Sequence, residues 1–348
     1  MTRGKWSTVF LSIPILALYL CVMFHNDKKD LQLLPEDPRA GVVTTAPLTS
    51  RRLKILETPG PARKEVEASY APENVQETET MSERQRDVRE RCADLLTLSE
   101  RAQQPNSKEF LVSERYQLVW CNVFKAASST WLDNFLRMAG YSGVIVRNHL
   151  SSPVELARKV YPRPTSEQLQ TYLHQLNYTS FIIVRDPFQR LLSAYRDKLE
   201  PKNQSYYRSL KCQIKEKHGH RKSPHDCQPT FSEFVNHVID EDAQGMQPNE
   251  HWAPYYRFCS PCQVEFDFIL HFESLSVDEA VLLENVSGLA EVVKPQTLHS
   301  SHTDYARVTA EYFSQLTSRQ LDGLLKIYLK DFRIFGYSET KYFDYINS

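Results

Sequence analysis

The 348-residue chain lacks an excess of charge of either sign. Its 42 Lys and Arg residues offset 43 Asp and Glu residues, which leaves a net charge of -1 at pH 7. This balance gives no general electrostatic reason to expect a nucleic acid or an anionic membrane surface as a partner. The sequence also shows no internal repeat and no cluster of metal-ligating residues. We therefore expect no nucleic-acid partner and no metal, and we look for charged sites locally.

A nearly uncharged apolar segment, Trp6 to Phe24, dominates the N-terminus. It is long enough for a membrane-spanning helix, and no small-residue cleavage site closes it. Polar, Pro-rich sequence follows at once, which disfavours a buried helix of a soluble domain. We expect a cytoplasmic tail over residues 1–5, a transmembrane signal anchor over 6–24, a lumenal stem over 25–80 and a lumenal folded domain over 81–348.

The side of the membrane follows from charges, cysteines and sequons. Arg3 and Lys5 precede the anchor and favour a cytoplasmic N-terminus, although Lys28 and Lys29 follow it. Six cysteines lie beyond the anchor, an even number that permits complete disulfide pairing in an oxidising compartment. Three glycosylation sequons fit the same compartment and begin at Asn177, Asn203 and Asn285. Together these features predict a single-pass type II membrane protein of the secretory pathway.

Strand-like and helical patterns alternate in the folded part. Apolar runs at 117–124, 181–184 and 264–272 are typical of buried strands. Helical spacing of apolar residues follows at 128–139, 187–199, 231–238 and 318–329, and also occurs at 81–103, where we expect the arginines to face solvent. The alternation predicts an α/β fold with a parallel sheet.

Three helix starts carry local signals. Thr130 with Asp133 resembles a capping box, and Pro187 suits the first turn of a helix. Thr230 suits an N-cap position ahead of the apolar residues that follow it.

The segment Cys121 to Trp131 joins an apolar strand to a helix through a loop of small residues. The first N–H groups of a helix have no intrahelical partner and bind phosphate with help from the helix dipole. Lys125 adds a positive charge, and the residues after it are small or carry hydroxyl groups. The Walker pattern is absent, because the loop has no glycine and its lysine precedes the small residues.

A second segment, Val184 to Ser193, repeats this logic. Arg185 stands at a strand end, where a guanidinium can bind phosphate through two hydrogen bonds, and Ser193 can donate a hydroxyl from the following helix. A structural ion pair is the simplest role for any one arginine here, and Arg190 and Arg196 have Asp186 and Asp197 nearby. Two such connections in one domain nevertheless suggest a nucleotide with phosphates at two ends.

These segments resemble those of a known family. Lys125 to Trp131 is similar to the 5′-phosphosulfate loop of Golgi carbohydrate sulfotransferases, and Arg185 to Arg196 is similar to their 3′-phosphate motif. The resemblance is strongest to the branch with chondroitin and dermatan 4-O-sulfotransferases and the HNK-1 sulfotransferase. It runs in order from about residue 81 to 337 through the motifs Asn249-Glu-His-Trp252, Cys259-Ser-Pro-Cys262, Phe272-Glu-Ser-Leu275 and Asp331-Phe-Arg-Ile-Phe-Gly-Tyr337. Two departures are Phe124 in place of a proline and Ser128-Ser129-Thr130 in place of Cys-Thr-Asn.

The resemblance implies a P-loop-like sulfotransferase fold, with a central parallel sheet flanked by helices, and a Golgi location. It also implies 3′-phosphoadenylyl sulfate as co-substrate, without a metal. Lys125 would neutralise charge on the leaving group, while Arg185 and Ser193 would hold the 3′-phosphate. The loop that would hold the 5′-phosphate consists of Lys125, Ala126, Ala127, Ser128, Ser129 and Thr130.

The reaction also requires a base for the acceptor hydroxyl, and histidine suits that task near neutral pH. His251 and His149 are the candidates, with His251 preferred, and Glu250 is an alternative. A structural role for His251 beside Trp252 is equally compatible with the sequence.

The resemblance leads us to expect sulfation of a glycan, at O4 of N-acetylgalactosamine in chondroitin or dermatan. An HNK-1-type or uronyl 2-O-sulfotransferase, a nucleotide-dependent kinase and a non-catalytic glycan-binding protein remain alternatives. The basic stretch 198–222 is either a plain exposed loop or a track for glycosaminoglycan.

The spacing of the cysteines bears on their chemistry. Cys259-Ser-Pro-Cys262 lacks the context of a redox or zinc site, so a structural disulfide is favoured there. Cys212 and Cys227 bracket a basic loop and form a second predicted bridge.

Overall fold

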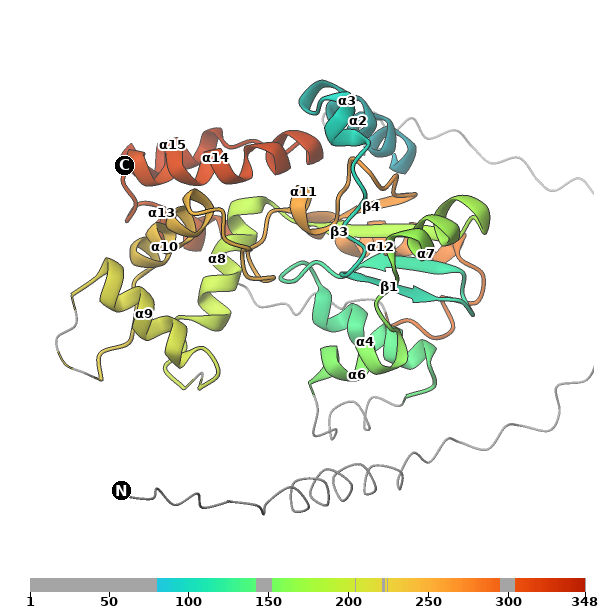
Figure 1. Ribbon diagram of the computed structural model, residues 1–348, viewed down its shortest axis with the longest axis horizontal. Coiled ribbons are helices and arrows are strands. Elements are labelled where there is room, and N and C mark those ends of the chain that lie inside the picture. The colour runs from blue at the N-terminus through green and yellow to red at the C-terminus, as the bar shows by residue number, and fades with distance from the viewer. Residues whose placement is uncertain are drawn as a thin grey trace, which may run out of the picture. The chain divides into compact units, whose positions relative to one another are not determined.

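The computed structural model describes residues 80–141, 152–203, 205–220, 223, 225–294 and 304–347 (Figure 1). The expected anchor at 6–24, nearly all of the expected stem and the candidate base His149 lie outside these described residues. Within the described ranges, no helix is long and apolar enough to cross a membrane.

A mixed sheet lies at the centre of the fold, with four strands in the order β1-β2-β3-β4 among the described residues. The strands are β1 (Phe110–Ser113), β2 (Leu118–Cys121), β3 (Thr179–Val184) and β4 (Phe268–His271). β2, β3 and β4 are parallel, as the alternating pattern predicts, and Trp120 pairs with Phe181. The sequence did not predict β1, which runs antiparallel to β2 because only a four-residue turn joins the two strands.

The helices follow the strands in alternation. They are α2 (Met81–Leu95), α3 (Leu98–Arg101), α4 (Ser128–Met138), α6 (Pro153–Val160), α7 (Ser166–Gln170), α8 (Pro187–Lys198), α9 (Arg208–His218), α10 (Phe231–Ala243), α11 (Tyr255–Phe258), α12 (Leu275–Asn285), α13 (Tyr305–Phe313), α14 (Ser318–Phe335) and α15 (Thr340–Asn347). A π-helical turn (Thr171–Gln175) follows α7, and a 3₁₀ turn (Phe272–Ser274) precedes α12. Helices α4 and α6 lie on one side of the sheet, and α2, α11 and α14 lie on the other (Figure 1). The α/β architecture is therefore confirmed.

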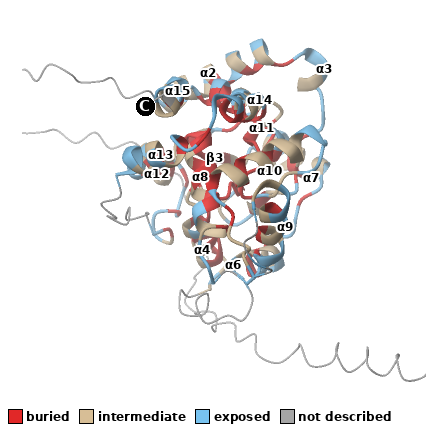
Figure 2. Cartoon of the chain, turned by 90° about the vertical axis from the view of Figure 1, so that its left-hand side faces the viewer, coloured by how far each residue is buried: buried red, intermediate tan, exposed pale blue. Residues whose placement is uncertain are grey.

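Aromatic side chains fix α4 against the sheet. Trp120 packs on Phe135 with ring centroids 5.3 Å apart, and Trp131 packs on Phe181 at 4.5 Å. All four are fully buried. Figure 2 shows that buried residues concentrate around β3 and α8, the two elements that carry the second predicted phosphate segment. The start of α4 and the start of α8 therefore both rest on a rigid core.

Two of the three predicted helix starts are confirmed. Pro187 is the first residue of α8, and Asp186 caps this helix by accepting hydrogen bonds from the N–H groups of Phe188 and Gln189. Thr230 caps α10 and forms a capping box. The capping box predicted at Thr130 is wrong, since α4 begins earlier, at Ser128.

The predicted helix at 81–103 is divided, and one of its arginines is not solvated. Thr97 starts a second helix by capping α3, which ends α2 at Leu95. Arg84 lies 2.6 Å from Asp278 of α12 and donates to the carbonyl oxygen of Ile269 at 3.0 Å. The prediction of a fully solvated arginine face is therefore wrong, because α2 packs against β4 and the loop before it.

Disulfides link all six cysteines of the described chain. The pairs are Cys92–Cys262, Cys121–Cys259 and Cys212–Cys227. The predicted Cys212–Cys227 bridge is confirmed. Cys259 and Cys262 are structural as expected but do not pair with each other, because β2 and α2 bring partners 138 and 170 residues away in sequence. The Cys121–Cys259 bridge holds the end of β2, directly ahead of the predicted phosphate loop.

Candidate active site

A cavity of about 300 Å³ lies between α8, α13 and the loop that follows β2. Lys125, Arg185 and Ser193, predicted from two separate segments, all line it. The remaining lining residues are Gln189, Leu192, Arg196, Asp197, Glu200, Tyr305, Val308 and Thr309. The two predicted anion sites therefore share one cavity.

The loop between β2 and α4 turns without glycine. Lys125 and Ala127 both have left-handed backbone conformations, with φ values of 69° and 59°. Such φ values are costly for residues with a Cβ and tend to occur where function requires them. Within the described residues, no side chain caps the start of α4, so its first N–H groups remain available. Of residues 125–130, only Lys125 contributes to the cavity lining.

Lys125 forms an ion pair across the cavity. Its Nζ lies 3.0 Å from Oδ2 of Asp197 on α8, and Lys198 contacts the same carboxylate oxygen at 3.0 Å. Burial lowers the pKa of Lys125, and the ion pair with Asp197 opposes this effect. Burial alone would raise the pKa of Asp197, but Lys125 and Lys198 hold it below its usual value. The cavity thus contains a partly buried cation that is paired with the carboxylate of Asp197.

Arg185 is buried and its backbone is fixed. Its N–H donates to the hydroxyl of Tyr255 at 2.9 Å, and that hydroxyl donates to the carbonyl oxygen of Arg185 at 2.9 Å. The guanidinium lies 4.6 Å from the ring centroid of Phe272 and 5.2 Å from that of Tyr305. Its Nε has no hydrogen-bond partner among the described residues. A buried donor without a partner in a cavity is well suited to an anionic ligand.

Arg190 connects the two halves of the site instead of forming the considered ion pair. This fully buried side chain donates to the carbonyl oxygens of Phe124 and His251, both at 3.4 Å, and to that of Ala253. Its guanidinium also lies 4.5 Å from the ring centroid of Tyr255. Arg190 therefore positions the phosphate loop relative to the segment that contains His251.

His251 lies beside the phosphate loop. Its ring centroid is 4.7 Å from that of Phe124, and its Nδ1 is 2.8 Å from Oδ1 of Asn249. Since an amide oxygen only accepts, Nδ1 carries the ring proton and Nε2 keeps its lone pair. Burial, together with Lys198 and Lys125, lowers the pKa of His251 to about 3. His251 is therefore a neutral imidazole near neutral pH.

The other candidate base in the described chain is Glu250. Burial raises the pKa of this carboxyl, and the charge of Glu109 raises it further. Its Oε1 lies 3.9 Å from Nδ1 of His251, on the protonated side of that ring. Glu250 also lines a different cavity from Lys125.

Sequence reasoning missed the wall that α13 contributes. Tyr305, Val308 and Thr309 come from this helix and line the cavity. The signal was present, since Asp304 caps α13 and apolar residues follow at helical spacing.

Comparison with known proteins identifies the family. The model of the family described as "Sulfotransferase family" matches residues 108–338, which include every lining residue of the cavity. The chain belongs to this sulfotransferase family. The predicted family is thus confirmed, and the protein is a sulfate-transferring enzyme by membership. No solved structure matches the chain.

Several curated relatives of this sulfotransferase are named carbohydrate sulfotransferases. Carbohydrate sulfotransferase 11 of Mus musculus is 29% identical over 252 residues, which cover 68% of this chain and 70% of the relative. Carbohydrate sulfotransferase 14 of Homo sapiens is 32% identical over 244 residues, which cover 66% and 60%. Carbohydrate sulfotransferase 8 of Homo sapiens is 30% identical over 278 residues, which cover 75% and 63%.

Proposed function

We propose that this sulfotransferase transfers a sulfuryl group from 3′-phosphoadenylyl sulfate to a hydroxyl of a glycan. The observation that carries the proposal is the convergence of Lys125, Arg185 and Ser193 on one cavity. The unpartnered Nε of Arg185 supports a bound phosphate there. The names of the relatives support a carbohydrate acceptor.

The side chains have separate tasks in this proposal. The donor supplies the sulfuryl group, and its leaving phosphate gains charge as the bond breaks. Lys125 neutralises that charge from a fixed position, which is preorganised electrostatic stabilisation. The first N–H groups of α4 hold the 5′-phosphate, and Arg185 with Ser193 holds the 3′-phosphate. Nε2 of His251 accepts the proton of the acceptor hydroxyl.

For the acceptor, we propose O4 of N-acetylgalactosamine in chondroitin or dermatan. The support is the motif resemblance to the 4-O-sulfotransferase branch. The test incubates the full-length protein with radiolabelled donor and a panel of chondroitin, dermatan, neutral N-acetylgalactosamine-terminated and glucuronate-terminated glycans, followed by disaccharide mapping. Label at O4 of N-acetylgalactosamine is expected. Label on a uronyl 2-O position or on terminal glucuronate would show that the acceptor is a different sugar. The absence of label on every glycan would refute the proposed sulfate transfer to a glycan.

We also propose a Golgi location, with residues 6–24 as a type II anchor. Three disulfides support an oxidising compartment, and Asn177, Asn203 and Asn285 are all exposed as glycosylation requires. The test is protease protection of a C-terminal tag in intact Golgi vesicles. The tag is expected to be protected, and glycosidase treatment is expected to change the electrophoretic mobility of the protein. Digestion of the tag in intact vesicles, with no sign of glycosylation, would contradict the proposal.

A further inference from the structure

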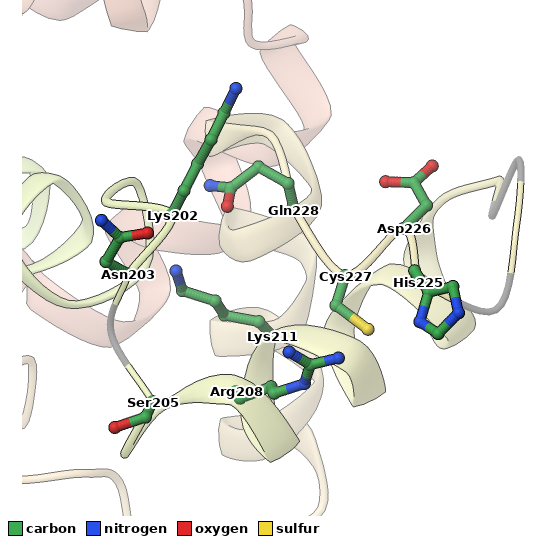
Figure 3. A pocket seen from close by; sticks show the side chains of 9 residues that line it. All are labelled: Lys202, Asn203, Ser205, Arg208, Lys211, His225, Asp226, Cys227 and Gln228. Carbon is green, nitrogen blue, oxygen red and sulfur yellow. The ribbon is translucent and has the colours of Figure 1, made fainter.

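A second cavity, of about 490 Å³, lies beyond the C-terminal end of α8. Lys202 lines it from the turn after α8, and Arg208 and Lys211 line it from α9 (Figure 3). The other lining residues are Asn203, Ser205, His225, Asp226, Cys227 and Gln228. We call this set the basic cavity.

Among the residues that the structure describes, the three cations of the basic cavity have no anionic partner. Neither Lys202, Arg208 nor Lys211 forms an ion pair with any residue that the structure describes. Lys211 is only 3% exposed and donates to the carbonyl oxygen of Pro201. Asp226 is the one acid in the lining, and Figure 3 shows its carboxylate directed away from Lys211. Lys211 is the buried cation of the three, and a buried cation is stable when an anion compensates it, so this arrangement favours an anionic ligand.

Other cations of α9, in contrast, form ion pairs with acids of a neighbouring helix. Towards the C-terminal end of α9, Lys215 lies 2.9 Å from Glu233, and Lys217 lies 2.7 Å from Asp240. Both acids come from α10, which packs against α9. The end of α9 that faces the basic cavity meets no such acid among the described residues.

The walls of the basic cavity are held in place before any ligand binds. The Cys212–Cys227 disulfide ties α9 to the opposite wall. Nε2 of Gln228 donates to the carbonyl oxygens of Leu199 and Glu200, at 2.8 and 2.9 Å. A preformed site loses less conformational entropy when it binds a ligand.

The basic cavity adjoins the candidate active site at two points. Glu200 lines the donor cavity and Lys202 lines the basic cavity, so their Cα atoms are at most about 7.6 Å apart. Tyr207, directly before Arg208, places its hydroxyl 3.3 Å from Nδ1 of His251. The three cations of the basic cavity therefore lie close to both the donor cavity and the segment that contains His251.

We propose that Lys202, Arg208 and Lys211 bind carboxylate or sulfate groups of an anionic acceptor glycan, on sugar units beyond the one that is sulfated. This inference rests on the proposed function and specifies its substrate class. The basic cavity thereby selects polyanionic chains over neutral oligosaccharides.

The test measures equilibrium binding of fluorescent hexasaccharides to the full-length protein. Unsulfated chondroitin presents only carboxylates, carboxyl-reduced chondroitin sulfate presents only sulfates, and carboxyl-reduced unsulfated chondroitin is neutral. The test variant is Lys202→Ala with Arg208→Ala, two exposed positions. Lys217→Ala, on the same helix, is the matched control. Every protein carries Asn203→Gln, because a glycan on that sequon would lie at the cavity.

At least one anionic hexasaccharide should bind the double variant about tenfold more weakly than the parent, whereas Lys217→Ala should match the parent. Unsulfated chondroitin and carboxyl-reduced chondroitin sulfate show whether the cavity binds a carboxylate or a sulfate. Equal affinity of parent and double variant, or no preference of the parent for anionic over neutral chains, would overturn the inference. Binding of 3′,5′-ADP is measured in parallel, so that loss of the donor site is detected separately.

Discussion

Nζ of Lys125 lies 3.0 Å from Oδ2 of Asp197, and this contact joins the predicted phosphate loop to the helix that carries Ser193. Lys125 belongs to the loop after β2, and Asp197 belongs to the helix after β3. Both side chains line the donor cavity. A phosphosulfate in the cavity would compete with Asp197 for this lysine, and the first two predictions follow from that competition.

Replacing Lys125 tests its role in transfer. Lys125→Ala should lower the rate of sulfate transfer by about 10²–10³-fold, because charge on the leaving group is no longer neutralised. The measurement is kcat with radiolabelled donor, with circular dichroism as a check of folding. Lys198→Ala is the control, since Lys198 pairs with the same carboxylate but does not line the cavity. A fully active Lys125→Ala protein would show that Lys125 does not stabilise the leaving group.

Replacing Asp197 tests the competition itself. Asp197→Asn should tighten binding of 3′,5′-ADP by about fivefold, because a negative charge no longer opposes the phosphates. Calorimetric titration provides the dissociation constant. Asp240→Asn, at an acid that pairs with Lys217 outside the cavity, should leave it unchanged. Weaker nucleotide binding by Asp197→Asn would show that this carboxylate helps to hold the ligand instead.

Arg190 should stabilise the folded protein as well as position the phosphate loop. Arg190→Leu leaves the carbonyl oxygens of Phe124, His251 and Ala253 without their donor, so the free energy of unfolding should fall by about 2–4 kcal/mol. Arg137→Leu, which removes an ion pair within α4, should cost less than about 1 kcal/mol. Denaturant unfolding under non-reducing conditions compares the two variants. Similar losses for both would argue against the central position of Arg190.

His251 predicts a pH dependence of stability. Its pKa is about 3 in the folded protein and about 6.5 when unfolded. The unfolded chain therefore binds more protons between these values, and stability should fall as the pH drops from 6.5 towards 3. His251→Phe should lose less stability than the wild type between pH 6.5 and pH 4. The exposed substitution His174→Phe is the control, and an unchanged pH slope for His251→Phe would contradict the lowered pKa.

Local chemistry made much of the fold predictable. Pro187 and Thr230 predict the starts of α8 and α10, because their preferences for helix N-termini depend on local sequence alone. The apolar runs around Trp120 and Phe181 indicate strands that are buried on both faces. Lys125 and Arg185 were predictable because each lies in a recognisable strand-to-helix connection, and Ser193 because it lies on the helix that follows one.

Contacts between distant segments were not predictable in the same way. The partners of Cys259 and Cys262 depend on how α11 meets β2 and α2, and nothing near those cysteines specifies this. The burial of Arg84 and the carbonyl partners of Arg190 arise from the same long-range packing. The left-handed backbone at Lys125 also lacked its usual signal, because no glycine marks it.

The most direct test of the central claim compares nucleotides that differ only in where their phosphates lie. The full-length protein is titrated calorimetrically with 3′,5′-ADP and with ordinary ADP, and the titrations are repeated with Arg185→Ala. If Lys125 and Arg185 form two anion sites in one cavity, the wild type should bind 3′,5′-ADP at least about tenfold more tightly, and Arg185→Ala should lose that preference. Equal affinity of the wild type for both nucleotides would contradict the account.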